Sequence, residues 1–316
     1  MSTTIHNLAR LAGLNPSTVS RALRNDPRVR KSTRERISAL AAEHGYIPNL
    51  NARNLADGKT RMIALLMGSL EFPVEREVAV RLNEIFSRSG YTLVIFSYAP
   101  DANRLYADRL EKLTQKICDA AILFIPDDRI LTPQVHALLD SIRCPLVCLD
   151  RWFDKYPLPT VTTDNVPAIR GLCDLAENAG MDGAILNYHA ANTVSRNRGE
   201  HLRRELTQRN IPFLQPDRPD DIPAFLRKNR ICKPAVFTNN ANDFSHLVPY
   251  LPDGFLTAAF DRKLPDERSR SGPVFLCIQD FRKIAETAAE QILGQLSGMP
   301  AENRIIPVPP VEFLTF

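Results

Sequence analysis

Apolar residues recur at every third or fourth position over residues 5–12 and again over residues 16–23, and turn residues separate the two runs. This spacing predicts two short helices. The second is expected to start at Pro16, because proline suits the first helical position, with Asn15 as its side-chain cap. A third helix is expected over residues 31–44. Three short helices around a small core predict an all-α helix-turn-helix unit.

From Arg61 onward the pattern changes to short apolar runs that alternate with helical spacing. The expected strands are 62–67, 92–97, 120–125, 146–149, 160–163, 183–187, 235–238 and 256–260. The expected helices are 78–89, 105–116, 133–141, 167–178, 195–209, 222–228 and one near 244–250. This alternation predicts α/β architecture with parallel sheets covered on both faces. Two such sets predict two lobes, with ligands bound at the carboxyl ends of the strands where the lobes meet.

These patterns separate a helical unit at 1–48, a short segment at 49–60 and an α/β region from 61 onward. The segment at 49–60 buries little by itself, so it should become ordered only against a partner.

The net charge of +4 is unevenly distributed along the chain. Residues 1–60 hold ten Lys and Arg against four acids, a net +6, which leaves −2 for the remainder. A basic head on a nearly neutral body is typical of a protein that binds a polyanion such as DNA. The apolar runs are too short to span a bilayer, and the first residues show no secretory signal, so we expect a cytoplasmic protein.

Residue patterns that carry catalysis are missing from the sequence. We find no G-x-S-x-G, phosphate-loop, H-E-x-x-H or G-x-G-x-x-G motif, and the six histidines are dispersed. The six cysteines form no C-x-x-C pair or zinc-type cluster, so reduced, buried thiols are expected. We therefore expect no enzyme, no cofactor and no metal. A ligand-binding protein of the periplasmic type, without DNA function, is the alternative.

Five sequence pieces in the first sixty residues resemble the LacI/GalR family of transcriptional regulators. They are IHNLARLAGL at 5–14, STVSRAL at 17–23, TRERI at 33–37, GYIPN at 45–49 and NARNL at 51–55. Weaker matches follow in order as LDR at 149–151, DN at 164–165, PAVF at 234–237, FD at 260–261 and IQDF at 278–281. The resemblance covers essentially the whole chain and is most specific in the head.

This resemblance implies a sequence-specific transcriptional regulator, in most members a repressor, with a periplasmic-binding-protein-like sensor. It implies a helix-turn-helix DNA-binding domain at 1–48 and a hinge helix with its linker at 49–60. The N-lobe of the sensor is then expected at 61–159 with 281–305, and the C-lobe at 160–280 with 306–316. A small-molecule effector, a sugar or sugar derivative, would bind between the lobes and control binding to double-stranded DNA. The expected operator is palindromic, because a homodimer reads two half-sites. No heptad tail of the kind that makes tetramers is seen, so a dimer is expected.

The second helix is expected to lie in the major groove, with Pro16, Ser17 and Arg21 toward base edges. Arg21 suits a bidentate guanine contact. In isolation a solvated surface arginine would be the simpler interpretation, but within this motif a base or phosphate contact is favoured. Leu55, with Ala52 beside it, would be the minor-groove wedge, or else an ordinary linker leucine. The full set of expected DNA-binding residues is Thr4, Asn15, Pro16, Ser17, Thr18, Ser20, Arg21, Asn25, Arg28, Tyr46, Asn49, Ala52, Arg53 and Leu55.

Two positions depart from the family pattern. Pro16 has no hydrogen-bonding side chain, so its base contact should be apolar or absent. Arg30 stands where many relatives have a Ser or Thr cap, so the cap of the third helix is expected to shift to Ser32. The other basic residues of the head, Arg24, Arg28, Lys31 and Arg34, would contact phosphates or remain solvated.

The resemblance also implies an effector set in the sensor, which is Asp150, Arg151, Trp152, Arg198, Asn240, Asp261 and Phe281. Carboxylates and amides hydrogen-bond sugar hydroxyls, and two arginines would favour a phosphate or carboxylate on the ligand. The hypothesis is therefore a sugar phosphate or an acidic sugar. Asp150 or Asp261 could instead cap a helix or pair across the lobes, and Trp152 could stack on a sugar ring or belong to the core.

Overall fold

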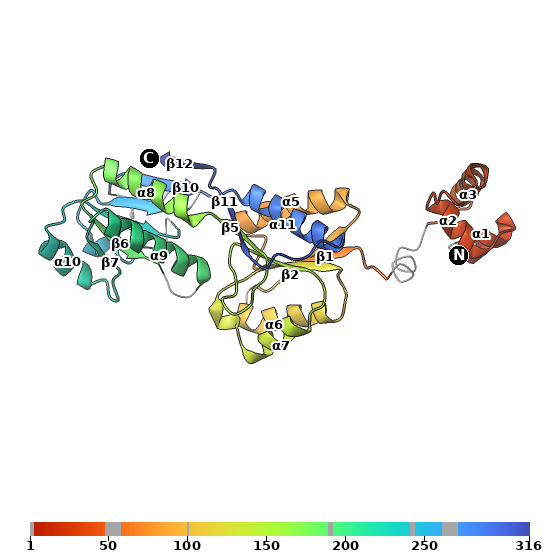
Figure 1. Cartoon of the computed structure of the whole chain (residues 1–316), viewed down its shortest axis with the longest axis horizontal. Coiled ribbons are helices and arrows are strands. Elements are labelled where there is room, and N and C mark those ends of the chain that lie inside the picture. Colours follow the sequence, from red (N-terminus) through yellow and green to blue (C-terminus); the bar gives the residue numbers. More distant parts are fainter. Residues whose placement is uncertain (1–2, 48–57, 100, 189–191, 241–243, 261–270) are drawn as a thin grey trace. The chain divides into compact units, whose positions relative to one another are not determined.

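The computed structural model describes residues 3–47, 58–99, 101–188, 192–240, 244–260 and 271–316, and the chain divides into two compact units, 1–60 and 61–316. The first unit, the head, contains helices α1 (Ile5–Ala12), α2 (Pro16–Leu23) and α3 (Lys31–Glu43) (Figure 1). Its buried core consists of Leu8, Ala9, Val19, Ala22, Val29, Ile37 and Ala41. Each core residue comes from one face of its helix or from the loop between α2 and α3, as the helical spacing predicts.

Local chemistry sets the helix ends of the head. Gly13 ends α1 in the left-handed conformation, with φ +66°, and its N–H donates to carbonyls of the last turn. Asn15 precedes α2 but makes no side-chain cap, so that expectation is wrong and Pro16 alone marks the start. The expected cap at Ser32 is also wrong, because α3 begins at Lys31 with Arg30 in the capping position and no side-chain cap.

The second unit, the sensor, contains two six-stranded sheets. The first has the order β11-β5-β4-β3-β1-β2 and the second the order β12-β10-β9-β8-β6-β7. All neighbours are parallel except β12, which pairs antiparallel with β10. The strands are β1 (Met62–Met67), β2 (Thr92–Ser97), β3 (Ala120–Phe124), β4 (Leu146–Leu149), β5 (Thr160–Thr163), β6 (Gly183–Asn187), β7 (Phe213–Leu214), β8 (Pro234–Thr238), β9 (Leu256–Ala259), β10 (Val274–Ile278), β11 (Ile305–Val308) and β12 (Glu312–Thr315).

Helices cover both faces of each sheet. They are α5 (Pro73–Arg88), α6 (Ala102–Thr114), α7 (Pro133–Ser141), α8 (Asn165–Asn178), α9 (Thr193–Gln208), α10 (Asp221–Asn229) and α11 (Phe281–Leu296), with 3₁₀ turns η1 (Asp128–Ile130) and η2 (Val248–Tyr250). Figure 1 shows α5 and α11 on one side of the first sheet and α6 and α7 on the other. One buried cluster underlies α5 and α11 and a second underlies α6 and α7, so the first lobe has the expected three layers.

The expected lobe boundaries need correction at two strands. β5 pairs with β4, and β11 pairs with β5 through Ile305↔Thr160, so both strands belong to the first sheet. The chain therefore passes to the second sheet after Thr163 and again after Val308, one strand later than predicted each time. Which sheet these two strands join depends on parallel pairing between segments that are far apart in the chain. The spacing of apolar residues within each segment does not indicate that pairing.

Other differences from the prediction are local. The expected helix near 244–250 is only turns and the 3₁₀ turn η2, where Pro249 has no N–H to continue a helix. The helix predicted from Val78 begins at Pro73, and β7, β10, α11, β11 and β12 were not predicted. None of the described helices is both long enough and apolar enough to cross a membrane.

Candidate functional site

The exposed face of α2 is the candidate DNA-reading surface of the head. Val19 and Ala22 are fully buried against α1 and α3, so the opposite side of the helix faces outward. Ser17 and Arg21 lie exposed on that side, whereas Pro16, Thr18 and Ser20 are partly buried. Within the described residues Arg21 makes no side-chain hydrogen bond or ion pair. Its guanidinium is therefore available to an external acceptor.

Other arginines of the head already have internal partners. Arg28 donates from Nε and Nη2 to the two oxygens of Asp26, the shortest contact being 2.7 Å. These hydrogen bonds lower the pKa of the Asp26 carboxyl to about 2. Arg34 donates to the carbonyls of Val29 and Asp26, and Arg36 donates to the carbonyl of Ala12. Arg34 therefore holds the loop between α2 and α3, which is more than the surface role expected for it.

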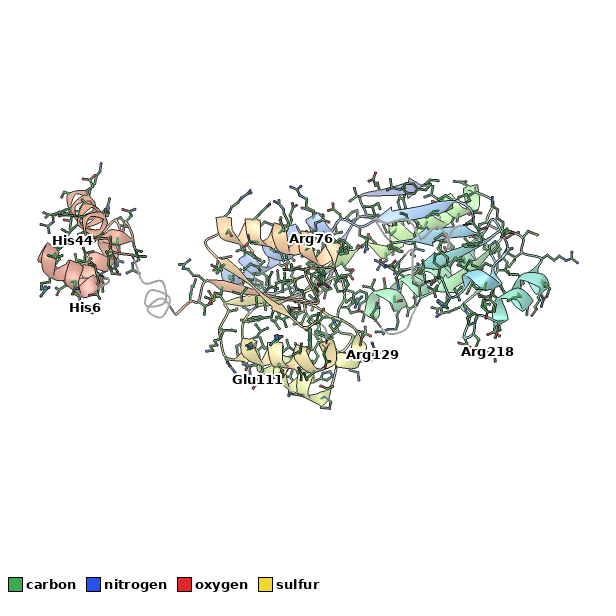
Figure 2. The ribbon with its side chains drawn as sticks, turned by 180° about the vertical axis from the view of Figure 1, so that it is seen from behind. His6, His44, Arg76, Glu111, Arg129 and Arg218 are labelled. Carbon is green, nitrogen blue, oxygen red and sulfur yellow. The ribbon has the colours of Figure 1, made fainter. Side chains whose placement is uncertain are left out.

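The Asp26–Arg28 pair has a counterpart in the sensor. Asp127 and Arg129 are also two residues apart, and there too the backbone N–H, Nε and Nη2 of the arginine donate to the carboxylate. Figure 2 labels Arg129. In both pairs, a carboxylate two residues earlier in the chain holds an exposed guanidinium in place. The pair in the head is therefore a local contact, and Arg28 keeps further N–H groups that could donate to a phosphate.

The remaining residues expected to bind DNA have mixed settings. Thr4 caps α1 by accepting from the N–H of Asn7. Tyr46 packs on the core of the head, and this burial raises the pKa of its hydroxyl. Asn25 has φ +55°, a left-handed conformation that asparagine tolerates. Asn49, Ala52, Arg53 and Leu55 lie outside the described residues.

A cavity of about 540 Å³ lies in the sensor and is lined by residues associated with both sheets. The first lobe contributes Gly68, Phe72, Val74, Glu75, Tyr98, Phe124, Ile125, Pro126, Asp150 and Arg151. Asn192, Val194, Arg198, Asn239, Asn240, Gln279 and Phe281 complete the lining. Most of these residues follow the carboxyl ends of β1, β2, β3, β4, β8 and β10 or begin the next helix. This is where parallel α/β sheets place their ligand sites.

Asp150 enters this cleft through an unusual turn. It has φ +63°, and the N–H of Arg151 donates to the carbonyl of Leu149 at 2.7 Å across it. A hydrogen bond between residues two positions apart, around a central residue with positive φ, defines a strained γ-turn. Among the described residues, one carboxylate oxygen of Asp150 is buried without a hydrogen-bond partner. Such an orphaned acceptor facing a polar cavity is what a ligand hydroxyl would satisfy.

Arg151 lies directly beside this carboxylate. Its Nε is 3.9 Å from Asp150 Oδ2, and its Nη1 donates to the carbonyls of Ile125 and Pro126. The guanidinium is therefore held by the backbone at the end of β3, which leaves fewer of its N–H groups for a ligand.

Arg198, on α9, is the most deeply held charge of the cleft, with 4% of its surface exposed. It donates to three side-chain oxygens, those of Asn165 (3.0 Å), Asn239 (3.2 Å) and Gln279 (2.6 Å). Its guanidinium carbon also lies 3.6 Å from the centre of the Phe260 ring. Burial lowers the pKa of Arg198, and the Asp150 carboxylate opposes this effect. Neutral amides hold the guanidinium here, and three of its five N–H groups are used by them.

Glu75 is a second acid in the cleft that the sequence did not indicate. Its carboxylate accepts from the backbone N–H of Ser69 at 2.8 Å. A β-carbon at Gly68 would come within 3.1 Å of this carboxylate, so a glycine there allows the close approach. Burial raises the pKa of Glu75, and the two backbone donors and Arg151 counteract it. Burial also raises the pKa of the neighbouring Tyr98 hydroxyl, with Glu75 contributing.

The structure places five of the expected effector residues along this cavity, namely Asp150, Arg151, Arg198, Asn240 and Phe281. Trp152 is not among the lining residues and instead contacts Thr193 and Asp154. Asp261 lies outside the described residues. Sequence reasoning missed Glu75, Tyr98, Asn192, Asn239 and Gln279. Tyr98 and Asn239 directly follow predicted strands, and Gln279 directly follows β10. This position at a strand end is the signal that could have identified them.

Comparison with known proteins finds similar sequences among bacterial regulators. Residues 4–49 match the family described as bacterial regulatory proteins, lacI family. The ribose operon repressor of Haemophilus influenzae is 29% identical over 213 residues, which is 66% of this chain and 61% of that protein. The regulator DegA of Bacillus subtilis is 26% identical over 67% of this chain and 63% of its own length. The matched part of the chain thus spans less than two thirds of these curated relatives.

Solved structures extend the likeness of the fold to nearly the whole chain. A lac repressor dimer bound to operator and the anti-inducer ONPF has a TM-score of 0.74 at 18% identity and covers 98% of this chain and 97% of its own. A sugar transporter subunit from Rhodobacter sphaeroides has a TM-score of 0.62 at 15% identity and covers 81% of this chain and 98% of its own. The fold is thus a helix-turn-helix head joined to a two-lobed, periplasmic-binding-protein-like sensor. The sequence likeness to the lacI family lies in the head, at residues 4–49, and the likeness of the fold covers nearly the whole chain.

Proposed function

We propose that this protein is a sequence-specific transcriptional repressor whose binding to DNA is controlled by a small polyhydroxylated ligand. The observation that carries the proposal is the sensor cleft, where a buried arginine, an orphaned carboxylate oxygen and several side-chain amides face one cavity. The head supplies the second half of the proposal, because Arg21 stands exposed on the outward face of α2. DNA and ligand sites on separate units are the elements of a ligand-controlled regulator.

The charges of the cleft favour a neutral ligand. Its described lining holds two acids, Glu75 and Asp150, and two arginines, Arg151 and Arg198. Backbone carbonyls hold Arg151, and three amides hold Arg198. An added phosphate would face both acids, and both arginines already donate some of their N–H groups to protein oxygens, which disfavours such a ligand. We therefore prefer a neutral sugar to the sugar phosphate or acidic sugar that the two arginines suggested in the sequence.

The shape of the cavity suits such a ligand. Carboxylates, amides and guanidinium groups hydrogen-bond hydroxyls, and the rings of Phe72, Phe124 and Phe281 provide apolar faces for the C–H surface of a sugar. Among structural relatives, a cellobiose complex of the regulator CelR and a fructose 1-phosphate complex of Cra from Pseudomonas putida represent the neutral and phosphorylated classes.

The DNA side of the proposal follows from symmetry. We propose that two copies bind a near-palindrome in the cytoplasm, each inserting α2 in the major groove. The segment 49–56 would fold as a hinge helix in the minor groove, with Leu55 as the wedge beside Ala52. Ligand-driven movement of the lobes would then change how the two hinge segments meet.

The first experiment selects DNA from a random pool with the full-length protein at near-physiological salt. Recovery of a palindromic site is expected. If neither the protein alone nor the protein with added cell metabolites enriches any sequence, the regulator proposal fails. Calorimetry with ribose, cellobiose and fructose 1-phosphate tests the ligand class. Heat with fructose 1-phosphate and none with the neutral sugars would contradict a neutral ligand.

A further inference from the structure

A second set of contacts crosses between the lobes without lining the ligand cavity. The backbone N–H of Trp152 donates to the Thr193 hydroxyl oxygen at 3.2 Å, and this hydroxyl donates back to the Trp152 carbonyl at 3.1 Å. Trp152 follows β4 of the first sheet, and Thr193 begins α9, which packs on the second. Thr193 is buried and Trp152 is partly buried, so both hydrogen bonds are partly shielded from water. One hydroxyl thus ties the two lobes together through backbone groups.

An ion pair lies next to this hydroxyl contact. Arg196 Nη2 is 2.5 Å from Asp154 Oδ2, while the Trp152 indole N–H donates to Asp154 Oδ1 at 3.2 Å. Asp154 is 59% exposed, so the pair by itself is weak and sensitive to salt. The indole N–H fixes the carboxylate in the direction of α9, which reduces the entropy lost in forming the pair.

The residues of this cross-lobe contact lie next to cleft residues on both segments. Asp150 and Arg151 line the cavity directly before Trp152. Asn192, the cap of α9, and Val194 line it on either side of Thr193, and Arg198 lines it two positions after Arg196. A ligand that contacts both Asp150 and Asn192 therefore holds the same two segments together. The cross-lobe contact and the ligand thus act on the same two backbone segments through different side chains.

We propose that Trp152, Asp154, Thr193 and Arg196 form a latch that holds the two lobes closed and sets the closed fraction of the ligand-free protein. A ligand that binds only the closed form gains apparent affinity in proportion to that fraction. The latch thereby sets the ligand concentration at which the protein responds. The consequence for DNA rests on the proposed function, whereas the effect on lobe closure does not.

Loss of one shielded hydrogen bond should shift the ratio of closed to open protein by about fivefold. Thr193→Val removes the hydroxyl and leaves the indole and its carboxylate in place. Asp154→Asn removes the ion pair with little change of shape. Both variants should bind a cleft ligand more weakly, Thr193→Val by about threefold to tenfold and Asp154→Asn by less, although neither residue lines the cavity.

The test uses the full-length, ligand-free protein and reads Trp152, which is the single tryptophan of the chain. Acrylamide quenching of its fluorescence and small-angle scattering are measured for wild type, Thr193→Val and Asp154→Asn. Stronger quenching and a larger radius of gyration are expected in both variants. Thr193→Ser, which keeps the hydroxyl, should restore wild-type values. Circular dichroism confirms that each variant is folded.

A matched control is Glu302→Gln, because Glu302 pairs with Arg304 at the same 2.5 Å and is 58% exposed, but within three residues of chain. Glu302→Gln should change neither the quenching of the tryptophan fluorescence nor the radius of gyration. The latch is refuted if Thr193→Val quenches and scatters as wild type does, even where Asp154→Asn alters the adjacent indole. These measurements need neither DNA nor ligand, so failure of the latch is distinct from failure of the regulator proposal.

Discussion

The head and the sensor cleft hold their principal arginines in opposite environments. Arg21 is exposed on α2, and within the described residues its side chain has no partner. Arg198 is 4% exposed and has three amide oxygens and an aromatic ring around it. A flexible, solvated arginine adapts to a large polyanion, whereas a buried one recognises a small molecule only because its position is set in advance.

In the head, the residues that stabilise the fold differ from those that would recognise DNA. In the cleft, the same residues stabilise the fold and line the cavity. The core of the head lies on the inner face of α2, so its outer face can change without loss of packing. In the cleft, the groups that hold Arg198 also line the cavity, since Asn239 and Gln279 do both. Substitutions should therefore affect the two regions in different ways, and four changes test this.

The largest effect is expected from Arg198→Lys. Lysine keeps the charge but cannot reach three amide oxygens at once, and each buried acceptor left unpaired costs about 1–3 kcal/mol. Stability should fall by about 3 kcal/mol, and ligand binding should fall at least tenfold, as measured by chemical unfolding and calorimetry. Arg204→Lys is the control, because Arg204 lies exposed on the same helix and only approaches Glu200 at 3.9 Å. Equal stability of the two variants would contradict the role of Arg198.

Arg21→Ala should weaken binding to the selected operator by about 1–3 kcal/mol and relax one base position. Thermal stability should not change, because the side chain is exposed. Arg21→Lys keeps the charge without the guanidinium fork and should lose base discrimination while retaining binding to random DNA. Fluorescence anisotropy on both DNAs measures this. Equal losses on operator and random DNA would remove Arg21 from base recognition.

A smaller effect is expected from Glu75→Gln. Burial raises the pKa of Glu75, so the folded protein favours its protonated form and loses stability as pH rises through that pKa. The neutral glutamine should raise the melting temperature at pH 7 by about 1–2 °C, with no gain below the ordinary pKa of glutamate. Calorimetric melting at pH 7 and pH 4 compares the two. A lower melting temperature at pH 7 would show that the ionised carboxylate stabilises this site.

The smallest effect belongs to the Asp26–Arg28 pair of the head. The pKa of Asp26 is lowered to about 2, so the stability from this pair is present above about pH 4 and is lost as pH falls through about 2. Nuclear magnetic resonance should find the carboxyl titrating near pH 2 in wild type. In Arg28→Ala the midpoint should move back toward the ordinary aspartate value. An unchanged midpoint would mean that Arg28 does not hold this carboxylate.

Much of the fold could be predicted from the sequence because it depends on local periodicity. The helices of the head start and end within one residue of the predicted positions, since apolar spacing, Gly13 and Pro16 all act over one helical turn. The strands from β1 to β6 follow apolar runs in the same way. The site was harder to predict. Glu75 lies at the start of α5, a helix predicted to begin later, so no pattern brought it to the cleft.

The amino-acid sequence by itself determined the helices of the head, its charge, its outward-facing Arg21 and the alternation of strands and helices in the sensor. Each of these depends on neighbours within a few positions along the chain. The tertiary structure decided that β5 and β11 complete the first sheet and that three amides from distant segments hold Arg198. It also decided that Trp152 contacts Thr193 and does not line the cavity. Such contacts join residues tens to more than a hundred positions apart, and only the packing of whole strands and helices determines which of them meet.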